Sequence, residues 1–374
     1  MRLTWRGLGT LLAAAVLFAL GEVAGYPVLL GLAAAAVAAV LAALAVTSRR
    51  PRVEVVRQVY PDRVERGRPA FVALRVRNPN SRRQPAFTAT DHVGTQPLRV
   101  AVRSLAGGAE VPYTNEVPTE RRGRHRVGPL VLDRSDALGL VRSRLSMSDT
   151  ATLWVYPRVY PVRVDAAAHL RQHHDGQASE TAPRGSLDQR EVREYVVGDE
   201  VRHLHWKATA RTGRLMIRDR ADPNQPQFTV LVDNRPENHA VEEAVEIAAS
   251  MLVGAVNADH RGRLVSSGGV DVATDGGSSA VRRLLDELCV LDRAAETGLP
   301  LVHRALSRSG GGSLVAISAA VSSTDRAALA SLRTSYPDLV LISLGGPVEL
   351  PGVRVLPASN ALDAIRRWHA VVAR

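Results

Sequence analysis

Cysteine is almost absent from this chain, since Cys289 is the only one among 374 residues. A disulfide framework within one chain is therefore excluded, which is compatible with a reducing compartment. Aromatic residues make up only 4% of the sequence, so we expect cores built from alanine, valine and leucine. The motif G-x-x-x-x-G-K-[ST] is missing, and no G-x-G-x-x-G run stands between a strand and a helix. The sequence thus predicts no nucleotide site and no cofactor.

The charge of the chain is strongly unbalanced. Lysine and arginine number 48 against 37 aspartates and glutamates, which gives a net charge of +11 and a pI near 10.7. A basic chain can bind nucleic acid through its phosphates. Here, however, the basic residues are spread along the sequence, and RNP-type aromatics and recognition motifs are missing. This distribution favours a protein on the cytoplasmic side of a membrane, with no specific nucleic-acid partner.

Residues 7–46 are an almost uninterrupted run of glycine, alanine, leucine and valine. The second half, 28–46, has no charge and would span ~28 Å as a helix, close to the thickness of a bilayer core. The first half avoids a charge at the membrane centre if Glu22 lies near the turn between the halves. A cleaved signal peptide would explain only one of the two runs. Arginines flank both ends, so we predict that residues 1–48 form a two-pass hairpin in the cell membrane with both termini cytoplasmic.

Within a predicted domain at 49–160, residues 52–160 alternate apolar and polar side chains at a period of two, as in VEVVRQVY, FVALRVRN, LRVAVRS and ATLWVYPRV. Short strands separated by turn signals are typical of an antiparallel β-sandwich, here an Ig-like one. A basic cluster lies within this region. It suggests either a charged, solvated strand edge or a site for a phosphate or lipid headgroup. The cluster consists of Arg121, Arg122, Arg124 and Arg126 around His125.

The most specific stretch is 188–218, within a predicted linker and signature segment at 161–225. It interleaves charged residues with aromatic and aliphatic ones, which predicts a folded, partly buried network in which each charge finds a partner. A strand and a helix both remain possible for 201–207. We expect arginines and carboxylates here to join the sandwich to the following domain. The residues of this signature network are Arg193, Glu194, Tyr195, Gly198, Asp199, Arg202, Trp206, Lys207, Arg211 and Gly213.

This stretch also carries a family resemblance. The runs R-E-Y-x-x-G-D at 193–199, R-x-L-x-W-K-A-x-A-R at 202–211 and T-G-R-L at 212–215 resemble the signature of the domain of unknown function 58 family. The upstream run RRGRHRVGPLVL at 121–132 is similar to the region that leads into that signature. The resemblance implies no established activity. It does imply a von Willebrand factor A-like domain in the C-terminal part and a MoxR-type AAA+ ATPase as partner.

From residue 226 to 374, apolar runs of strand length alternate with helical patterns, which predicts an α/β domain with a mainly parallel sheet. The first run, FTVLV, ends at Asp233. Metal-binding von Willebrand factor A-like domains carry D-x-S-x-S at this point, where hydroxyl and carboxylate oxygens suit Mg²⁺. Here both serines are replaced, and Arg235 follows instead. We therefore predict an Asp233–Arg235 ion pair at a degenerate site, and no metal.

These observations predict an α+β multidomain protein that acts as a membrane-anchored, cytoplasmic-facing scaffold or adaptor. It would not be an enzyme, and it would bind other proteins, including the AAA+ ATPase, in a chaperone-like assembly. Two alternatives remain open: a nucleic-acid-binding protein, or an enzyme with its site in the 188–218 network. In that enzyme Asp199 would act as base, His205 as acid–base and Arg211 as anion clamp.

Overall fold

The computed structural model describes two compact units, Met1–Tyr156 and Pro157–Arg374. The described residues are 2–48, 53–94, 96–147, 149–164, 192–195, 204–218, 227–274, 278–308 and 311–372.

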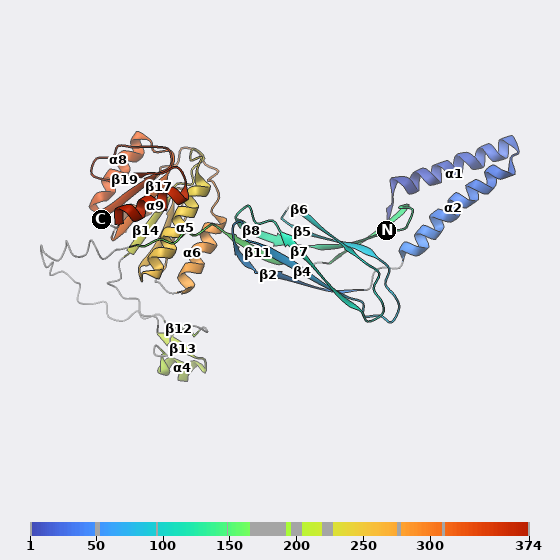
Figure 1. Ribbon diagram of the computed structural model, residues 1–374, viewed down its shortest axis with the longest axis horizontal. Coiled ribbons are helices and arrows are strands. Elements are labelled where there is room, and N and C mark those ends of the chain that lie inside the picture. Colours follow the sequence, from blue (N-terminus) through green and yellow to red (C-terminus); the bar gives the residue numbers. More distant parts are fainter. Residues whose placement is uncertain are drawn as a thin grey trace. The chain divides into compact units, whose positions relative to one another are not determined.

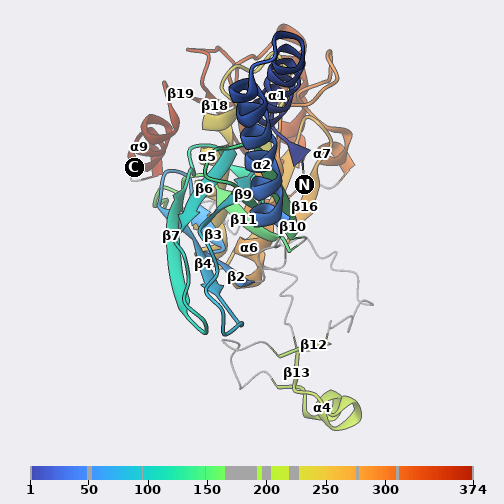
Figure 2. The same cartoon turned by 90° about the vertical axis from the view of Figure 1, so that its right-hand side faces the viewer.

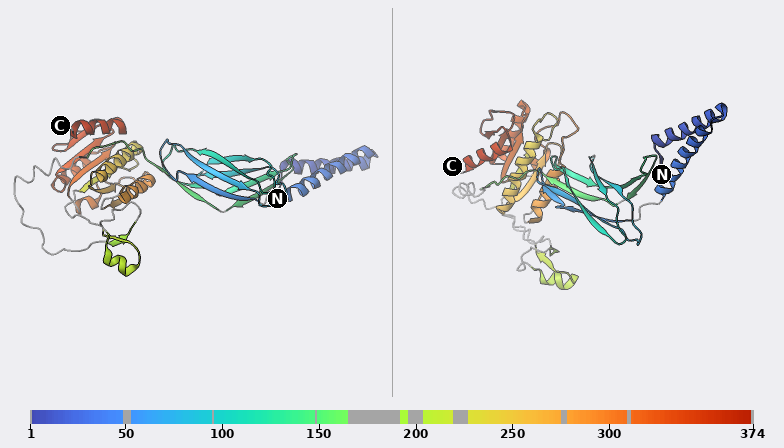
Figure 3. Two further views of the ribbon diagram at one scale, coloured as in Figure 1. Left: turned by 60° about the horizontal axis from the view of Figure 1, so that its bottom comes forward. Right: turned by 45° about the vertical axis from the view of Figure 1, so that its right-hand side comes forward.

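Two long apolar helices begin the first unit, α1 (Trp5–Ala24) and α2 (Pro27–Ser48), and run side by side (Figures 1 and 3). Both are long and apolar enough to cross a membrane, by length and composition. Helix α1 ends at Gly25, whose φ of 70° is readily adopted by glycine. The prediction of two apolar helices is confirmed, and Glu22 lies in the last turn of α1. Small buried residues let the helices approach closely: Ala14 and Gly21 in α1, with Ala33 in α2.

Eight strands of the first unit form one sheet, in the order β1-β10-β9-β5-β8-β11-β3, with β6 added on β5. A second sheet has the order β2-β4-β7. Every pair is antiparallel except β3 with β11. The strands are β1 (Arg2–Leu3), β2 (Glu54–Tyr60), β3 (Arg63–Glu65), β4 (Ala70–Arg77), β5 (Phe87–Val93), β6 (Gln96–Val102), β7 (Glu110–Val117), β8 (Gly123–Val127), β9 (Leu130–Ser135), β10 (Val141–Met147) and β11 (Ala151–Tyr156).

The alternation seen in the sequence builds the core of this unit. Val72 and Leu74 of β4 point inward and share one hydrophobic cluster with Leu132 of the eight-stranded sheet. A buried ion pair also joins the sheets. The Nε and Nη2 atoms of Arg57 on β2 lie 2.8 and 3.1 Å from the carboxylate oxygens of Asp91 on β5. The parallel β3–β11 pair departs from the antiparallel prediction because β3 arrives by a crossover from the other sheet rather than through a hairpin.

The second unit contains a six-stranded sheet in the order β16-β15-β14-β17-β18-β19. All neighbours are parallel except β15 with the edge strand β16, as predicted for a mainly parallel sheet. The strands are β14 (Gln227–Val232), β15 (Arg261–Ser266), β16 (Asp271–Ala273), β17 (Ser313–Ser318), β18 (Asp338–Ser343) and β19 (Arg354–Pro357). The helices are α5 (Val241–Asn257), α6 (Ser278–Val290), α7 (Arg304–Arg308), α8 (Ser323–Ser331) and α9 (Ala361–Val372).

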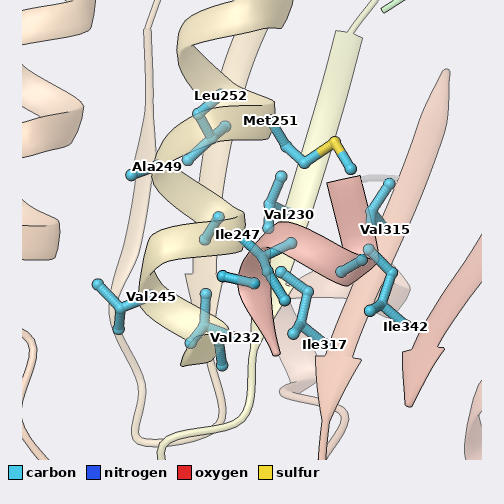
Figure 4. Close-up of a cluster of buried hydrophobic side chains, with 14 of the residues drawn as sticks. Val230, Val232, Val245, Ile247, Ala249, Met251, Leu252, Val315, Ile317 and Ile342 are labelled. Atoms are coloured by element: carbon cyan, nitrogen blue, oxygen red, sulfur yellow. The ribbon is translucent and has the colours of Figure 1, made fainter. Parts of the chain in front are cut away.

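Both faces of this sheet are buried, which explains the continuous apolar runs of its strands. Val230 and Val232 of β14 point toward one face, where they pack with Ile247 of α5 (Figure 4). Leu231 points toward the other face and packs in a separate cluster with Leu329 of α8. Because side chains alternate along a strand, β14 contributes to the hydrophobic clusters on both faces of the sheet.

Residues 157–164 lie on the α/β unit. The backbone N–H of Tyr160 donates to Ser250 Oγ of α5 at 2.9 Å. The indole N–H of Trp368 in α9 donates to the carbonyl of Arg163 at 3.0 Å, and Val164 is buried in the core. The start of the predicted linker is therefore packed against two helices of this unit.

Candidate functional site

The described part of the signature segment is a small group of elements, β12 (Val192–Glu194), α4 (Trp206–Thr212) and β13 (Met216–Arg218), seen in Figure 2. Strands β12 and β13 pair in antiparallel fashion. Helix α4 is held to β13 because the N–H of Met216 donates to Thr209 Oγ1 at 2.9 Å. Gly213 ends the helix with a φ of 70°. The sequence is compatible with a strand or a helix at 201–207, and the structure has a helix that begins at Trp206.

Three residues of the predicted network, Gly198, Asp199 and Arg202, lie outside the described residues, as does His203. Arg193 is described only by its backbone in β12. The N–H of Tyr195 donates to the carbonyl of Leu215 at 2.8 Å, which adds one more bond between the two segments.

The described charged side chains of the segment are exposed. Glu194 pairs with Arg214 at 3.3 Å, and both side chains are more than half exposed. Lys207 and Arg211 are exposed, and Trp206 is 68% exposed. The buried lattice that the sequence predicts is therefore not seen in the part of 188–218 that the structure describes. These residues form a charged surface with one aromatic side chain.

His205, the acid–base candidate of the enzyme alternative, has a structural role in this geometry. It stands at the N-cap of α4, where its Nδ1 accepts a hydrogen bond from the N–H of Ala208 at 3.0 Å. An imidazole nitrogen that accepts a hydrogen bond carries no proton. This hydrogen bond therefore fits the neutral ring in its Nε2–H tautomer.

A buried cluster of charges lies at the carboxyl end of β14. Both oxygens of Asp233 accept hydrogen bonds from Arg235, from Nε at 2.9 Å and from Nη2 at 3.0 Å. The remaining nitrogen, Nη1, lies 3.1 Å from Asp325 in α8. Ser318, at the end of β17, donates to Asp233 Oδ2 at 2.6 Å. The side chains of Asp233, Arg235 and Asp325 are 0, 8 and 6% exposed.

Every polar atom of this guanidinium has a partner. Arg235 Nη2 also donates to the carbonyl of Ala320 at 2.7 Å, and Nη1 to that of Leu299 at 3.4 Å. Asp325 closes the arrangement as the third helical residue of α8, where it accepts from the N–H of Ser322 at 3.0 Å in a capping box. These hydrogen bonds offset the cost of removing the charges from water.

The electrostatics of the cluster favour its charged form. Burial acts to lower the pKa of Arg235, but the hydrogen bonds and charge of Asp233, with the charge of Asp325, outweigh burial and raise it. Burial acts to raise the pKa of Asp325, but the hydrogen bonds from Ser322 and the nearby Arg235 outweigh burial and lower it. Both groups stay ionised at neutral pH.

This arrangement does not suit a divalent cation. The guanidinium of Arg235 occupies both carboxylate oxygens of Asp233, the oxygens that a metal would need. The predicted Asp233–Arg235 pair is confirmed. Among the described residues, no group of three or more histidines, cysteines, aspartates and glutamates could hold a metal ion.

Sequence reasoning missed two members of the cluster, Ser318 and Asp325. They lie 85 residues from Asp233 and 90 residues from Arg235 along the chain, respectively. A signal was present, because Ser322-x-x-Asp325 matches the capping-box pattern before a helix. Ser318 ends a strand parallel to β14, and the carboxyl ends of neighbouring parallel strands meet at one edge of a sheet.

Comparison with known proteins gives a match to one family, over part of the chain, and no activity. Residues 191–335 match the family described as "Protein of unknown function DUF58". A segment of 142 residues is 29% identical to "Uncharacterized protein YeaD" of Bacillus subtilis. That segment is 35% of this chain and spans about a third, 33%, of the relative's length.

Solved structures give only weak likenesses. The CARDB domain of a Pyrococcus furiosus protein, in complex with di-metal ions, matches 28% of this chain and 93% of its own, with 18% identity and a TM-score of 0.22. The alkylpurine DNA glycosylase AlkC of Pseudomonas fluorescens, bound to DNA with an abasic site analogue, matches 30% of this chain and 33% of its own, with 13% identity and a TM-score of 0.21. These scores establish no common fold. The match to the family of unknown function DUF58, in contrast, spans residues 191–335 and so includes both the α4 signature group and the buried cluster at Asp233.

Proposed function

We propose that the protein is a membrane-anchored scaffold that acts by binding other proteins and carries out no chemistry of its own. The observation that carries this proposal is the Asp233–Arg235–Asp325 cluster. It occupies the carboxyl edge of the sheet, where α/β folds commonly bind ligands. Its charged side chains pair with one another, and its guanidinium is fully hydrogen bonded. Such an arrangement suits a structural role better than a catalytic one.

The finer folds belong to the same proposal. We assign the second unit to the von Willebrand factor A-like class, supported by its five parallel strands, its antiparallel edge strand β16 and the aspartate that follows β14. We assign the strands of the first unit to an Ig-like sandwich, supported by two sheets that share one hydrophobic cluster. Under this assignment the guanidinium of Arg235 replaces the metal of related domains.

The membrane part of the proposal is a two-pass anchor with both termini in the cytoplasm. Helices α1 and α2 have the required length and hydropathy. Arg2 and Arg6 precede or begin α1, and arginines at 49, 50 and 52 follow α2 in the sequence. The positive-inside rule then directs both flanks to the cytoplasm.

The partner that we propose is a MoxR-type AAA+ ATPase, a soluble protein that would meet the scaffold on that side of the membrane. The exposed face of α4 is the contact that we favour. It presents the indole of Trp206 beside the cations of Lys207 and Arg211. Tryptophan and arginine are enriched in the residues that dominate binding energy, and the charge fits an acidic surface on the partner.

The test is affinity purification of the full chain from gently solubilised membranes, followed by identification of bound proteins. We expect an AAA+ ATPase to be recovered with the wild type and lost with Lys207→Glu/Arg211→Glu. The matched control is Arg282→Glu/Arg283→Glu, which reverses two exposed charges on α6. Failure to recover an ATPase with the wild type would refute the partner, and equal recovery with both variants would refute the α4 contact.

A further inference from the structure

An open cavity of about 810 Å³ lies where α1 begins, next to strand β10 of the first unit. One side of its lining is cationic and the other is apolar. The cationic side comes from two strands, and the apolar side comes from the last residue of β1 and the first turn of α1. The lining residues are Arg2, Leu3, Thr4, Trp5, Leu8, Arg142 and Arg144.

The fold fixes this cavity firmly. Strand β1 pairs with β10, so that Arg2 lies directly opposite Arg142. Thr4 then caps α1 and bonds to the turn before β10, with its N–H 2.9 Å from the carbonyl of Leu140. Gly7 packs against that same carbonyl so closely that a β-carbon would collide with it. The first turn of α1 therefore has one position relative to the arginines of β10.

The arginines on the cationic side outnumber the carboxylates that pair with them. Like charges at opposed positions of an antiparallel pair repel each other, as Arg2 and Arg142 do here. The carboxylate of Asp133 pairs with Arg142 and lies 3.3 Å from Arg144. One carboxylate thus serves two guanidiniums, and Arg2 has no ion pair among the described residues. A bound anion would relieve this repulsion.

The apolar side has the character of a membrane interface. Trp5 is 89% exposed at the start of α1, and Leu8 and Leu12 continue the same exposed face of the helix. Tryptophan is enriched where a spanning helix leaves the hydrocarbon region. A ligand that fills both sides needs an anionic group for the arginines and a hydrocarbon chain for this face.

We propose that this cavity binds an anionic phospholipid, with the phosphate between Arg2 and Arg144 and an acyl chain along Trp5 and Leu8. The inference rests on the proposed function in one respect, that α1 spans the membrane. Phosphate oxygens accept strong, charge-assisted hydrogen bonds from guanidiniums. A phosphodiester would neutralise one of the two positive charges that remain when Asp133 is counted against Arg2, Arg142 and Arg144.

The test uses the full chain in mild detergent, titrated with fluorescent phosphatidylglycerol or phosphatidylcholine. We expect the wild type to prefer phosphatidylglycerol and Arg2→Gln/Arg144→Gln to weaken that binding about tenfold, without affecting phosphatidylcholine. This variant keeps the Arg142–Asp133 pair. The matched control is Arg75→Gln/Arg77→Gln, which removes two exposed arginines from β4. The control should bind like the wild type.

Three results would overturn the inference: equal binding of the two lipids by the wild type, equal weakening by both variants, or displacement of the lipid by excess glycerol phosphate. The last would mean that a free phosphate suffices. Alkaline extraction of membranes from the same cells separates this inference from the proposed anchor. A chain that resists extraction but shows no lipid preference loses only the inference, whereas a chain that is extracted refutes the anchor.

Discussion

The α4 signature group and the Asp233 cluster use the same kinds of residue in opposite ways. In the signature group, Arg214 and Glu194 pair on the surface, and both side chains are more than half exposed. In the cluster, Arg235 is 8% exposed between two carboxylates, and its five donors are directed at fixed acceptors. The density of charge along the sequence is higher in the first region, but the buried lattice is in the second.

The difference teaches that burial, and not charge density, decides what an arginine contributes. An exposed ion pair gains little, because water solvates both partners well and side-chain entropy opposes the contact. A buried pair contributes little by itself, yet losing one partner is costly, because the other charge remains in a low dielectric. Arginines in the two regions should therefore respond very differently to substitution.

The largest effect is expected from Arg235→Met. The substitution leaves Asp233 and Asp325 buried without their cation, which should destabilise the α/β unit by roughly 3–5 kcal/mol. Amide hydrogen exchange of β14 and β17 in the full chain would measure this. The control is Arg214→Met at the exposed pair, where the cost should stay below about 1 kcal/mol. Similar costs at both sites would remove the contrast between the two regions.

Acid should weaken the cluster in a defined window. The pKa of Asp325 is lowered in the folded state, so the unfolded chain takes up this proton first as the pH falls. The contribution of Asp325 is complete above about pH 4, the usual range of an aspartate, and is lost as the pH falls from there through the folded pKa. Stability of the α/β unit therefore rises with pH in this window.

The same reasoning applies to Asp271, where the hydrogen bond from Arg263 outweighs burial and lowers the carboxyl pKa.

Denaturant midpoints of the wild type and Asp325→Asn, measured across this pH range, test whether Asp325 causes the loss of stability in acid. The variant should show a shallower pH dependence and, near neutral pH, a loss of about 1–3 kcal/mol. An unchanged slope would mean that other carboxyl groups cause the acid response.

A smaller effect is expected at His205. Its replacement by alanine removes the side-chain acceptor at the N-cap of α4, which should cost about 1 kcal/mol of local stability, while asparagine should retain the cap. Hydrogen exchange of the α4 amides distinguishes the two variants. Loss of cellular function in both, with protection of α4 retained in His205→Asn, would instead favour the enzyme alternative.

The smallest effect is expected from Lys207→Ala/Arg211→Ala. Both side chains are exposed, so stability should change by less than about 0.5 kcal/mol. Thermal unfolding of the full chain in detergent measures this. A clear destabilisation would show that these residues take part in the lattice that the sequence predicts, and would bring the two regions closer in character.

Much of the fold could be read from the sequence, because it depends on periodicity. The run FTVLV became β14, and the helical pattern at 240–258 became α5. The two-residue strand β1 and the parallel pairing of β3 could not be read, since each depends on a partner about 90 to 140 residues away. The residues of the Asp233 cluster also fall into a group that the sequence predicts and a group that it does not. Asp233 and Arg235 are neighbours in sequence and were predicted together, whereas Ser318 and Asp325 reach them only through the folded sheet.

The pairing of Arg2 and Leu3 with β10 affects the order in which the protein can be assembled. During synthesis, the N-terminal residues leave the ribosome well over a hundred residues before their partner strand does, so the edge of the eight-stranded sheet is completed late. A shortened protein that begins after the helices would leave Val141 and Arg142 of β10 without the strand that pairs with them. Such an edge invites strand addition between molecules. Preparing the part after the helices alone would therefore require covering that edge, for example with a charged or proline-bearing substitute for β1.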